Sequence, residues 1–193
     1  MIRLATVGDV PAILAVYGPY VEKTTHTFEY EVPSLTAFTE RFRAITEDFP
    51  WLVWEEDGRI LGYAYGSAPF ERAAYRWCGE VSVYLAPEIQ GRGIGRRLYS
   101  ALEQILAFQG YRVIYAIVTS ENEVSLAFHR ALGYRKTAEL PGCGVKFGRW
   151  LGITYLEKRI NIGETPSNMP EKFMSIVKDD RKIVKILDIL SLS

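Results

Sequence analysis

Cysteine is nearly absent from this sequence, which has only Cys78 and Cys143 among its 193 residues. Two cysteines are too few for a disulfide framework, and they lack the spacing of a zinc site. A disulfide-rich secreted protein is therefore excluded, and a reducing cytoplasm is the expected compartment. No metal site is expected.

Long apolar runs and a surplus of one charge are also missing. No stretch reaches the ~20 apolar residues of a membrane-spanning helix, and Asp9 and Pro11 interrupt the start of the chain before an export signal forms. Lys plus Arg total 23 and Asp plus Glu total 23, so the formal net charge is zero. This balance disfavours binding to nucleic-acid phosphates. We expect a soluble protein with neither membrane nor nucleic-acid partners.

Apolar residues are nevertheless plentiful, at 48% hydrophobic and 13% aromatic, and the length fits one main domain. Their periodicity predicts a mixed α/β sandwich. Predicted helices cover about 7–21, 34–45, 94–109 and 122–132, and predicted strands cover about 51–54, 60–65, 80–85, 113–118, 135–140 and 151–158.

Glycines mark the predicted boundaries. Asp57-Gly58 is a strong hairpin signal between the first two strands. Gly110 and Gly133 each follow an amphipathic run and are expected to end a helix. The Gly-rich segment 141–144 is expected to be the loop between the last two strands.

The composition changes after Arg159. Residues 161–167 are a polar linker, and Asn168 with Glu171 is spaced to cap a following helix. That helix carries an apolar stripe, which we expect to pack on its own domain or on a dimer mate. A helix lying on a membrane surface is the minor alternative, because aspartates offset the lysines. The stripe comprises Phe173, Ile176, Val177, Ile183, Val184, Ile186, Leu187 and Leu190.

The segment 90–95, Gln-Gly-Arg-Gly-Ile-Gly, follows a predicted strand and opens a predicted helix. Its glycines let main-chain N–H groups turn toward an anion at the positive end of the helix dipole, and Arg92, Arg96 and Arg97 add charge there. It is not a P-loop, since no Lys-Ser or Lys-Thr pair follows, and it lacks the third glycine and the later acidic residue of a dinucleotide-binding motif. A phosphate cradle is therefore predicted, with a plain surface turn as the alternative.

This segment resembles the coenzyme A signature of the GNAT acetyltransferase superfamily. Other segments resemble, more narrowly, the phosphinothricin and methionine sulfone/sulfoximine acetyltransferases, over about residues 1–160. They are residues 71–77, 80–84, Asn122 with Ser125, 128–134 and 145–150.

The resemblance implies a GNAT fold, a mixed and mostly antiparallel sheet of about seven strands flanked by about four helices, with the C-terminal helix appended. It implies a GNAT N-acetyltransferase domain over 1–160, followed by the linker and amphipathic helix at 161–193. Acetyl-CoA is the implied cosubstrate, a small-molecule amine the acceptor, and a homodimer the assembly.

The resemblance also implies roles for individual residues. Val83 and Leu85 would line the coenzyme arm through main-chain groups freed by a bulge in the strand. The implied cofactor-binding residues are Val83, Tyr84, Leu85, Gly91, Arg92, Gly93, Ile94, Gly95, Arg96, Asn122 and Ser125. The implied substrate-binding residues are Phe28, Arg72, Tyr75, Val145 and Lys146.

Two residues are implied to be catalytic. An amine is largely protonated at pH 7 and must lose a proton before it attacks a thioester. Glu80 resembles the family's general base and His129 its proton donor to the departing thiolate. The alternatives are a solvent-facing Glu80, a structural His129 and, for Arg72, a plain loop charge.

The expected function is direct acetyl transfer to the α-amino group of a small amino acid or analogue. Two alternatives stay open: acetylation of peptide N-termini or polyamines, which favours an open acidic groove, and a silent acyl-CoA-binding sensor.

Overall fold

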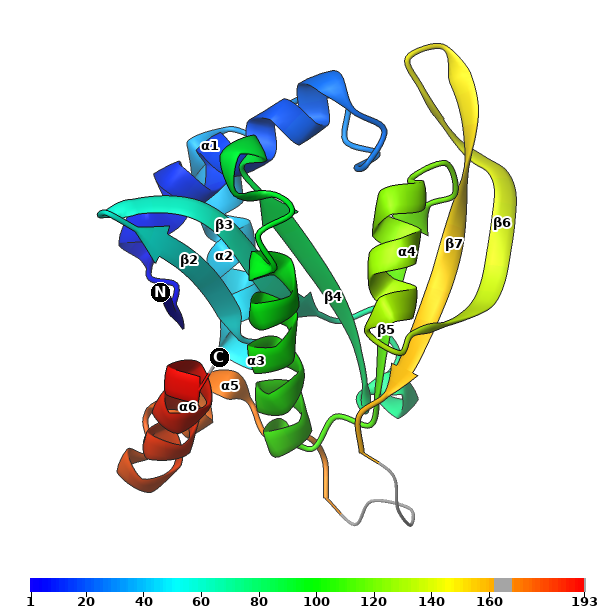
Figure 1. Ribbon diagram of the computed structural model, residues 1–193. Helices are drawn as coiled ribbons and strands as arrows, with labels where there is room; N and C mark the ends of the chain where they lie inside the picture. Colours follow the sequence, from blue (N-terminus) through cyan, green and yellow to red (C-terminus); the bar gives the residue numbers. More distant parts are fainter. Residues whose placement is uncertain (162–167, 193) are drawn as a thin grey trace.

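The computed structural model describes residues 1–161 and 168–192 as a seven-stranded sheet between two helical layers (Figure 1). The strands lie in the order β1-β2-β3-β4-β5-β7-β6, and every neighbouring pair is antiparallel except the parallel pair β4–β5. The strands are β1 Ile2–Leu4, β2 Trp51–Glu56, β3 Arg59–Ser67, β4 Cys78–Leu85, β5 Val113–Thr119, β6 Arg135–Lys146 and β7 Arg149–Arg159. The α-helices are α1 Val10–Lys23, α2 Leu35–Asp48, α3 Ile94–Gln109, α4 Glu123–Ala131, α5 Phe173–Val177 and α6 Asp180–Leu192.

The boundaries set by local signals agree with the predictions. The β2–β3 hairpin turns at Asp57-Gly58, where both residues have positive φ. The Ser34 hydroxyl accepts a hydrogen bond from the Ala37 N–H and caps α2. Gly110 ends α3 with a φ of 102°, a conformation that a side chain would strain.

Two predictions that involve contacts between sequence-distant residues are wrong. Strand β1, which the sequence did not predict, pairs with β2 and precedes both helices that were expected to come before the sheet. The segment 141–144 is not a loop, because β6 continues through it as a register shift opposite β7. The chain reverses instead at Phe147 and Gly148, which both have positive φ.

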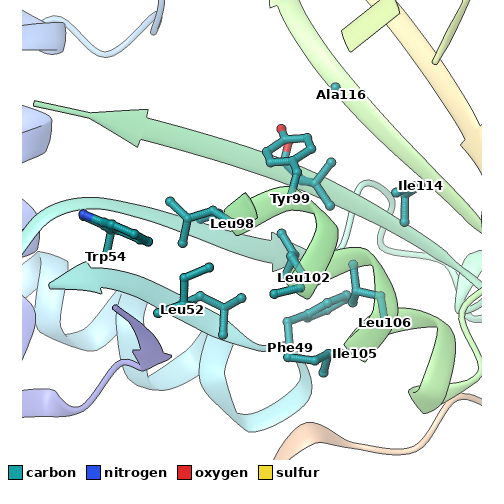
Figure 2. Close-up of a cluster of buried hydrophobic side chains, with 14 of the residues drawn as sticks. Phe49, Leu52, Trp54, Leu98, Tyr99, Leu102, Ile105, Leu106, Ile114 and Ala116 are labelled. Carbon is teal, nitrogen blue, oxygen red and sulfur yellow. The ribbon is translucent and has the colours of Figure 1, made fainter. Parts of the chain in front are cut away.

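The two faces of the sheet have separate cores. On one face, α3 packs aliphatic side chains against β2 and β5, as Figure 2 shows for Leu98, Leu102 and Leu106. On the other, α1 and α2 cover an aromatic layer in which Trp51 stacks on Tyr65 with ring centroids 4.2 Å apart. Side chains on opposite faces of β4 therefore contact different helical layers.

The C-terminal segment packs on the α3 face as two helices rather than one. Phe173 and Ile176 of α5 and Ile186 and Ile189 of α6 are buried in the same cluster as the side chains of α3. Most of the predicted stripe therefore packs on the chain's own domain, one of the two expected partners, whereas Val184 and Leu187 of the stripe are exposed. No helix in the described residues is long and apolar enough to cross a membrane.

The predicted cap of this segment is wrong. Helix α5 begins only at Phe173, after Lys172, and the Glu171 carboxylate binds the Lys182 ammonium at 2.6 Å. Pro170 disfavours helical backbone at the residue before it, so the turn that Asn168 was expected to cap does not form. Apart from Asn161, the predicted linker lies outside the described residues.

Ile186 provides a test of this packing, because its side chain is fully buried. We expect Ile186→Ala to lower the free energy of unfolding by about 2–4 kcal/mol through the cavity it leaves. Val184 is on the same helix but 53% exposed, so Val184→Ala should change it by about 0.5 kcal/mol at most. Urea denaturation of both variants measures the difference, and equal stabilities would contradict the described packing.

Candidate active site

Strands β4 and β5 are paired over only three residues, Cys78–Glu80 with Val113–Tyr115. Both strands continue past this point, so they spread apart (Figure 1). The register of β4 with β3 is continuous over Gly62–Ser67 and Glu80–Leu85. The expected bulge in β4 is therefore absent, and the opening comes from the end of β4–β5 pairing.

The opening leaves main-chain groups of β4 without a strand partner. Gly66 donates its N–H to the Pro50 carbonyl on the β2 side, so the opposite residue, Val81, directs its own N–H and C=O away from β3. Strand alternation gives Val83 and Leu85 the same direction. In the described residues no hydrogen bond reaches the Val83 main chain on this side, and its groups stay available to a ligand.

Leu85 differs from Val83, because its main chain already has partners. The Tyr20 hydroxyl of α1 donates to the Leu85 carbonyl at 2.6 Å, and the Gln90 side-chain amide donates to the same carbonyl at 3.2 Å. The Gln90 amide also lies 3.1 Å from the Tyr20 hydroxyl oxygen. Tyr20 thus ties the end of β4 to the first residue of the glycine-rich segment.

A cavity of about 560 Å³ occupies the opening and extends to the first turns of α3 and α4. It brings together most of the predicted cofactor residues with His129. The predicted residues in its lining are Val83, Tyr84, Leu85, Gly91, Gly93, Ile94, Gly95, Arg96, Asn122, Ser125 and His129.

The glycine-rich segment forms one end of this cavity. Gly91 and Gly93 have φ of 73° and 78°, and Gly93 is the N-cap of α3. Main-chain N–H groups and the helix dipole therefore favour an anion here. Only Arg96 of the three nearby arginines lines the cavity; the Arg92 guanidinium binds Glu56 at 2.8 Å, and Arg97 lies over the Trp54 ring.

His129 lies at the other end, buried among aromatic rings. Its Nδ1 is 2.7 Å from the Ser125 carbonyl, which can only accept, so Nδ1 carries the proton. Its Nε2 then accepts from the Tyr99 hydroxyl at 3.0 Å. Burial lowers the pKa of His129, which favours this neutral form. The engagement of both ring nitrogens supports the structural alternative for His129.

Tyr99 and Tyr20 also line the cavity, as do Phe128 and His26. The sequence did not single them out as site residues. Tyr99 lies at the edge of the α3 core in Figure 2, and its hydroxyl is 3.2 Å from the Val81 carbonyl. These four residues belong to no sequence motif that would mark them as site residues. The packing of the helices against the sheet brings them to the opening.

Glu80 lies at the last β4–β5 pair, opposite Tyr115, where the strands begin to separate. By strand alternation its side chain shares the face of Ser82 and Tyr84, the face covered by α1 and α2. It is outside the residues that line the 560 Å³ cavity. Burial raises the pKa of Glu80, and the described residues give it no ion-pair partner. Such a carboxylate is a candidate proton acceptor near neutral pH.

Three predicted substrate residues meet on this second face. The Lys146 ammonium, almost fully buried, donates to the Thr27 carbonyl at 2.8 Å. The Tyr30 hydroxyl donates to the Val145 carbonyl at 2.8 Å. The Phe28 ring lies against Gly144, so closely that a Cβ there would be 2.3 Å from the ring. The loop after α1 and strand β6 therefore form one wall.

Arg72 and Tyr75 belong to a separate, exposed segment between β3 and β4. Tyr75 packs on Phe70 with centroids 4.8 Å apart, and Phe70 contacts the Tyr115 ring. Tyr115 is the residue paired with Glu80, so the segment between β3 and β4 lies next to the point where β4 and β5 separate.

Within the described chain, no group of three or more His, Cys, Asp or Glu side chains is placed to hold a metal ion.

Comparison with known proteins identifies the family of this chain. The family described as Acetyltransferase (GNAT) domain matches residues 2–154. The chain belongs to the GNAT acetyltransferase family. The match covers all seven strands except the end of β7, and it stops before α5 and α6.

Individual relatives of this GNAT acetyltransferase agree on its class. It is 37% identical to a phosphinothricin N-acetyltransferase of Alcaligenes faecalis, over 88% of this chain and 86% of that one. It is 38% identical to an L-methionine sulfoximine/L-methionine sulfone acetyltransferase of Pseudomonas aeruginosa, over 86% and 96%. The structure of a Sinorhizobium meliloti phosphinothricin acetyltransferase with acetyl-CoA superposes with a TM-score of 0.81, at 35% identity over 88% and 92%.

Gly93→Glu tests the cradle. Acetyl-CoA is expected to raise the melting temperature of the wild type. In the variant the new carboxylate would stand where the coenzyme's anionic group is expected, so this increase should be lost. Gly133→Glu is the matched control, because Gly133 also has positive φ and open space around it but lies outside the cavity lining. Thermal-shift titrations of the two variants compare them. Retention of wild-type affinity in folded Gly93→Glu would place coenzyme A elsewhere.

Proposed function

We propose that this GNAT acetyltransferase transfers the acetyl group of acetyl-CoA to the α-amino group of a small amino acid or analogue. The observation that carries the proposal is the end of β4–β5 pairing at Glu80, which opens the glycine-lined cavity next to a buried carboxylate that has no ion-pair partner in the described residues. The names of the relatives support phosphinothricin, methionine sulfone and methionine sulfoximine as the first acceptors to test.

The proposed position of the coenzyme follows from the residues that line the 560 Å³ cavity. Its pyrophosphate would lie on the Gly91–Arg96 turn, with the α3 dipole and Arg96 opposite the negative charge. Its amide-containing arm would run along β4 and pair with the free Val83 main chain, as a neighbouring strand would. At the α4 side, Asn122 already accepts from the Ser125 N–H through its Oδ1, so its amide N–H₂ remains for the coenzyme.

The acceptor's place follows from charge. Its carboxylate requires a cation, for which the exposed Arg72 is available, and its ammonium requires a base, which Glu80 provides. The buried Lys146 would shape the acceptor site through its hydrogen bond to Thr27. Phe28, Tyr75 and Val145 add apolar and aromatic surface. When acetyl-CoA is bound it supplies an activated acetyl group; Glu80 removes the proton that blocks the amine's lone pair, either directly or through a water molecule.

The assembly proposed is a homodimer formed through the β6–β7 side. β6 is an edge strand, and edges of this kind invite pairing or cover. The β6–β7 hairpin exposes several large apolar side chains, and a cluster of this kind marks a candidate interaction surface. They are Leu140, Val145, Phe147 and Trp150. A cytoplasmic location accords with the free thiols of Cys78 and Cys143.

Glu80→Gln tests the catalytic role. The amide keeps the shape but cannot take a proton, so kcat should fall by ~10²–10⁴ while acetyl-CoA affinity stays unchanged. The wild-type rate should rise with pH through the raised pKa of Glu80, and the variant should recover partly at high pH, where the amine is already neutral.

A thiol-release assay across pH with a panel of amino acids, peptides and polyamines measures both effects. Glu157→Gln, a partly buried sheet glutamate on β7, is the control and should keep its activity. An unchanged rate and pH profile in Glu80→Gln would assign the proton to another group. Binding of acetyl-CoA without turnover of any amine would contradict the proposed activity and support the alternative of a non-catalytic acyl-CoA-binding sensor.

Trp150→Glu tests the assembly. Trp150 is 74% exposed on β7, and a buried carboxylate in its place should dissociate the dimer. Light scattering should give twice 21.9 kDa for the wild type and 21.9 kDa for the variant. Phe108→Glu, at an exposed aromatic of α3 away from β6, should stay dimeric. A monomeric, fully active wild type would contradict the proposal.

A further inference from the structure

The Tyr20 hydroxyl uses its hydrogen-bonding capacity on two other residues of the cavity lining. It donates to the Leu85 carbonyl at 2.6 Å, and it accepts from the Gln90 side-chain amide at 3.1 Å and from the Leu85 N–H at 3.4 Å. A hydroxyl has one proton to donate and two lone pairs. This group therefore has nothing left for a ligand, and its effect on binding acts through the residues that it holds.

At Leu85 the Tyr20 hydroxyl takes the place of a neighbouring strand. The N–H and C=O of Leu85 point away from β3, as those of Val83 do. The hydroxyl bonds both groups of Leu85, as a strand partner would, whereas in the described residues no hydrogen bond reaches the Val83 main chain on this side. Tyr20 therefore marks the end of the free edge that is available to a coenzyme arm.

The Tyr20 ring is held by the aromatic layer between α1 and the sheet. It packs edge-on against Tyr84 with ring centroids 5.1 Å apart, and Tyr84 stacks on Tyr63 at 5.3 Å. Both partners are strand residues, and Tyr84 is the neighbour of Leu85 in β4. The hydroxyl therefore reaches Leu85 from a position that packing fixes.

Residues 86–90 connect this end of β4 to the glycine-rich turn. They include the 3₁₀ turn Pro87–Ile89, whose Ile89 side chain is fully buried. At the end of the segment the Gln90 amide returns to the Leu85 carbonyl, at 3.2 Å, as well as to the Tyr20 hydroxyl. These hydrogen bonds close the segment into a loop, and the closure sets the spacing between the free edge at Val83 and the turn that follows Gln90.

Building on the proposed coenzyme position, we infer that Tyr20 is a positioning residue that couples the two parts of the coenzyme site, the edge for the amide-containing arm and the turn for the pyrophosphate. A ligand that spans both parts binds best when their spacing is already correct, because otherwise binding must order the loop. A ligand that occupies one part alone is indifferent to that spacing. Tyr20 thus raises the affinity for the complete coenzyme through Leu85 and Gln90.

Tyr20→Phe tests this coupling, because it keeps the ring and removes only the hydroxyl. The Kd of acetyl-CoA should rise about five- to tenfold, the scale of one neutral hydrogen bond. The Kd of S-acetylpantetheine, which ends before the pyrophosphate, should change by less than about twofold, because β3 still holds the edge at Val83. Titration calorimetry measures the first value, and competition with acetyl-CoA measures the second. With saturating acetyl-CoA, kcat should stay that of the wild type.

Two further variants accompany Tyr20→Phe. Gln90→Leu removes the other end of the same tie, so it should show the same selective loss of acetyl-CoA affinity. Tyr134→Phe is the matched control: its hydroxyl donates to Glu103 at 2.8 Å, and this buried tyrosine lies outside the cavity lining. Tyr134→Phe should leave both dissociation constants unchanged.

The outcomes separate the coupling from the proposed function. Equal losses for both ligands in Tyr20→Phe, no loss for either, or wild-type binding by Gln90→Leu overturns the role of Tyr20. Failure of acetyl-CoA to bind the wild type overturns the coenzyme position and the coupling together. If acetyl-CoA binds and no amine is acetylated, the proposed activity fails, and the two dissociation constants still decide whether Tyr20 couples the two parts of the site.

Discussion

Three residue pairs join β4 to β5, and the site depends on where they stop. A sheet satisfies its main-chain groups by pairing them with the next strand, and β4 loses that partner after Glu80 while the strand continues for five more residues. The groups that are left face a cavity rather than solvent. Because Glu80 is in the last β4–β5 pair, it lies at the closed end of the opening between the two strands.

The two helical layers hold the opening from opposite sides. From α1, the Tyr20 hydroxyl donates to the Leu85 carbonyl, and from α3 the Tyr99 side chain lies beside the Val81 carbonyl while its hydroxyl donates to His129. Each helix is anchored by its own core, aliphatic for α3 and aromatic for α1. The exposed part of β4 is thus fixed at both ends by side chains whose positions are set by packing far from the opening, which is how a rigid binding edge is maintained.

Features that depend on local chemistry could be predicted from the sequence, and features that depend on distant pairing could not. The Asp57-Gly58 turn, the Ser34 cap and the glycine-rich start of α3 each require only a few adjacent residues. Strand β1 is three residues long and exists because β2 pairs with it. The continuation of β6 through 141–144 depends likewise on β7, opposite which β6 carries its extra residues as a register shift.

The site shows the same division. The glycine-rich segment could be predicted from its own residues because it lies at a helix start, which has a local sequence signature, whereas Asn122 was implied only by the family resemblance. The ion pair of Arg92 with Glu56, by contrast, joins residues brought together by the β2–β3 hairpin and the turn before α3.

The alternation along β4 has a consequence for how such a site changes over time. At Val83 the groups that face the cavity belong to the main chain, and the side chain packs against the α3 core. Substitutions there are therefore tolerated or rejected according to volume and hydrophobicity, while the binding groups persist under any residue except proline. The sequence of this part of β4 can therefore vary as it does in an ordinary core strand without loss of the main-chain binding groups. The identities of its residues alone do not reveal that the strand binds a ligand.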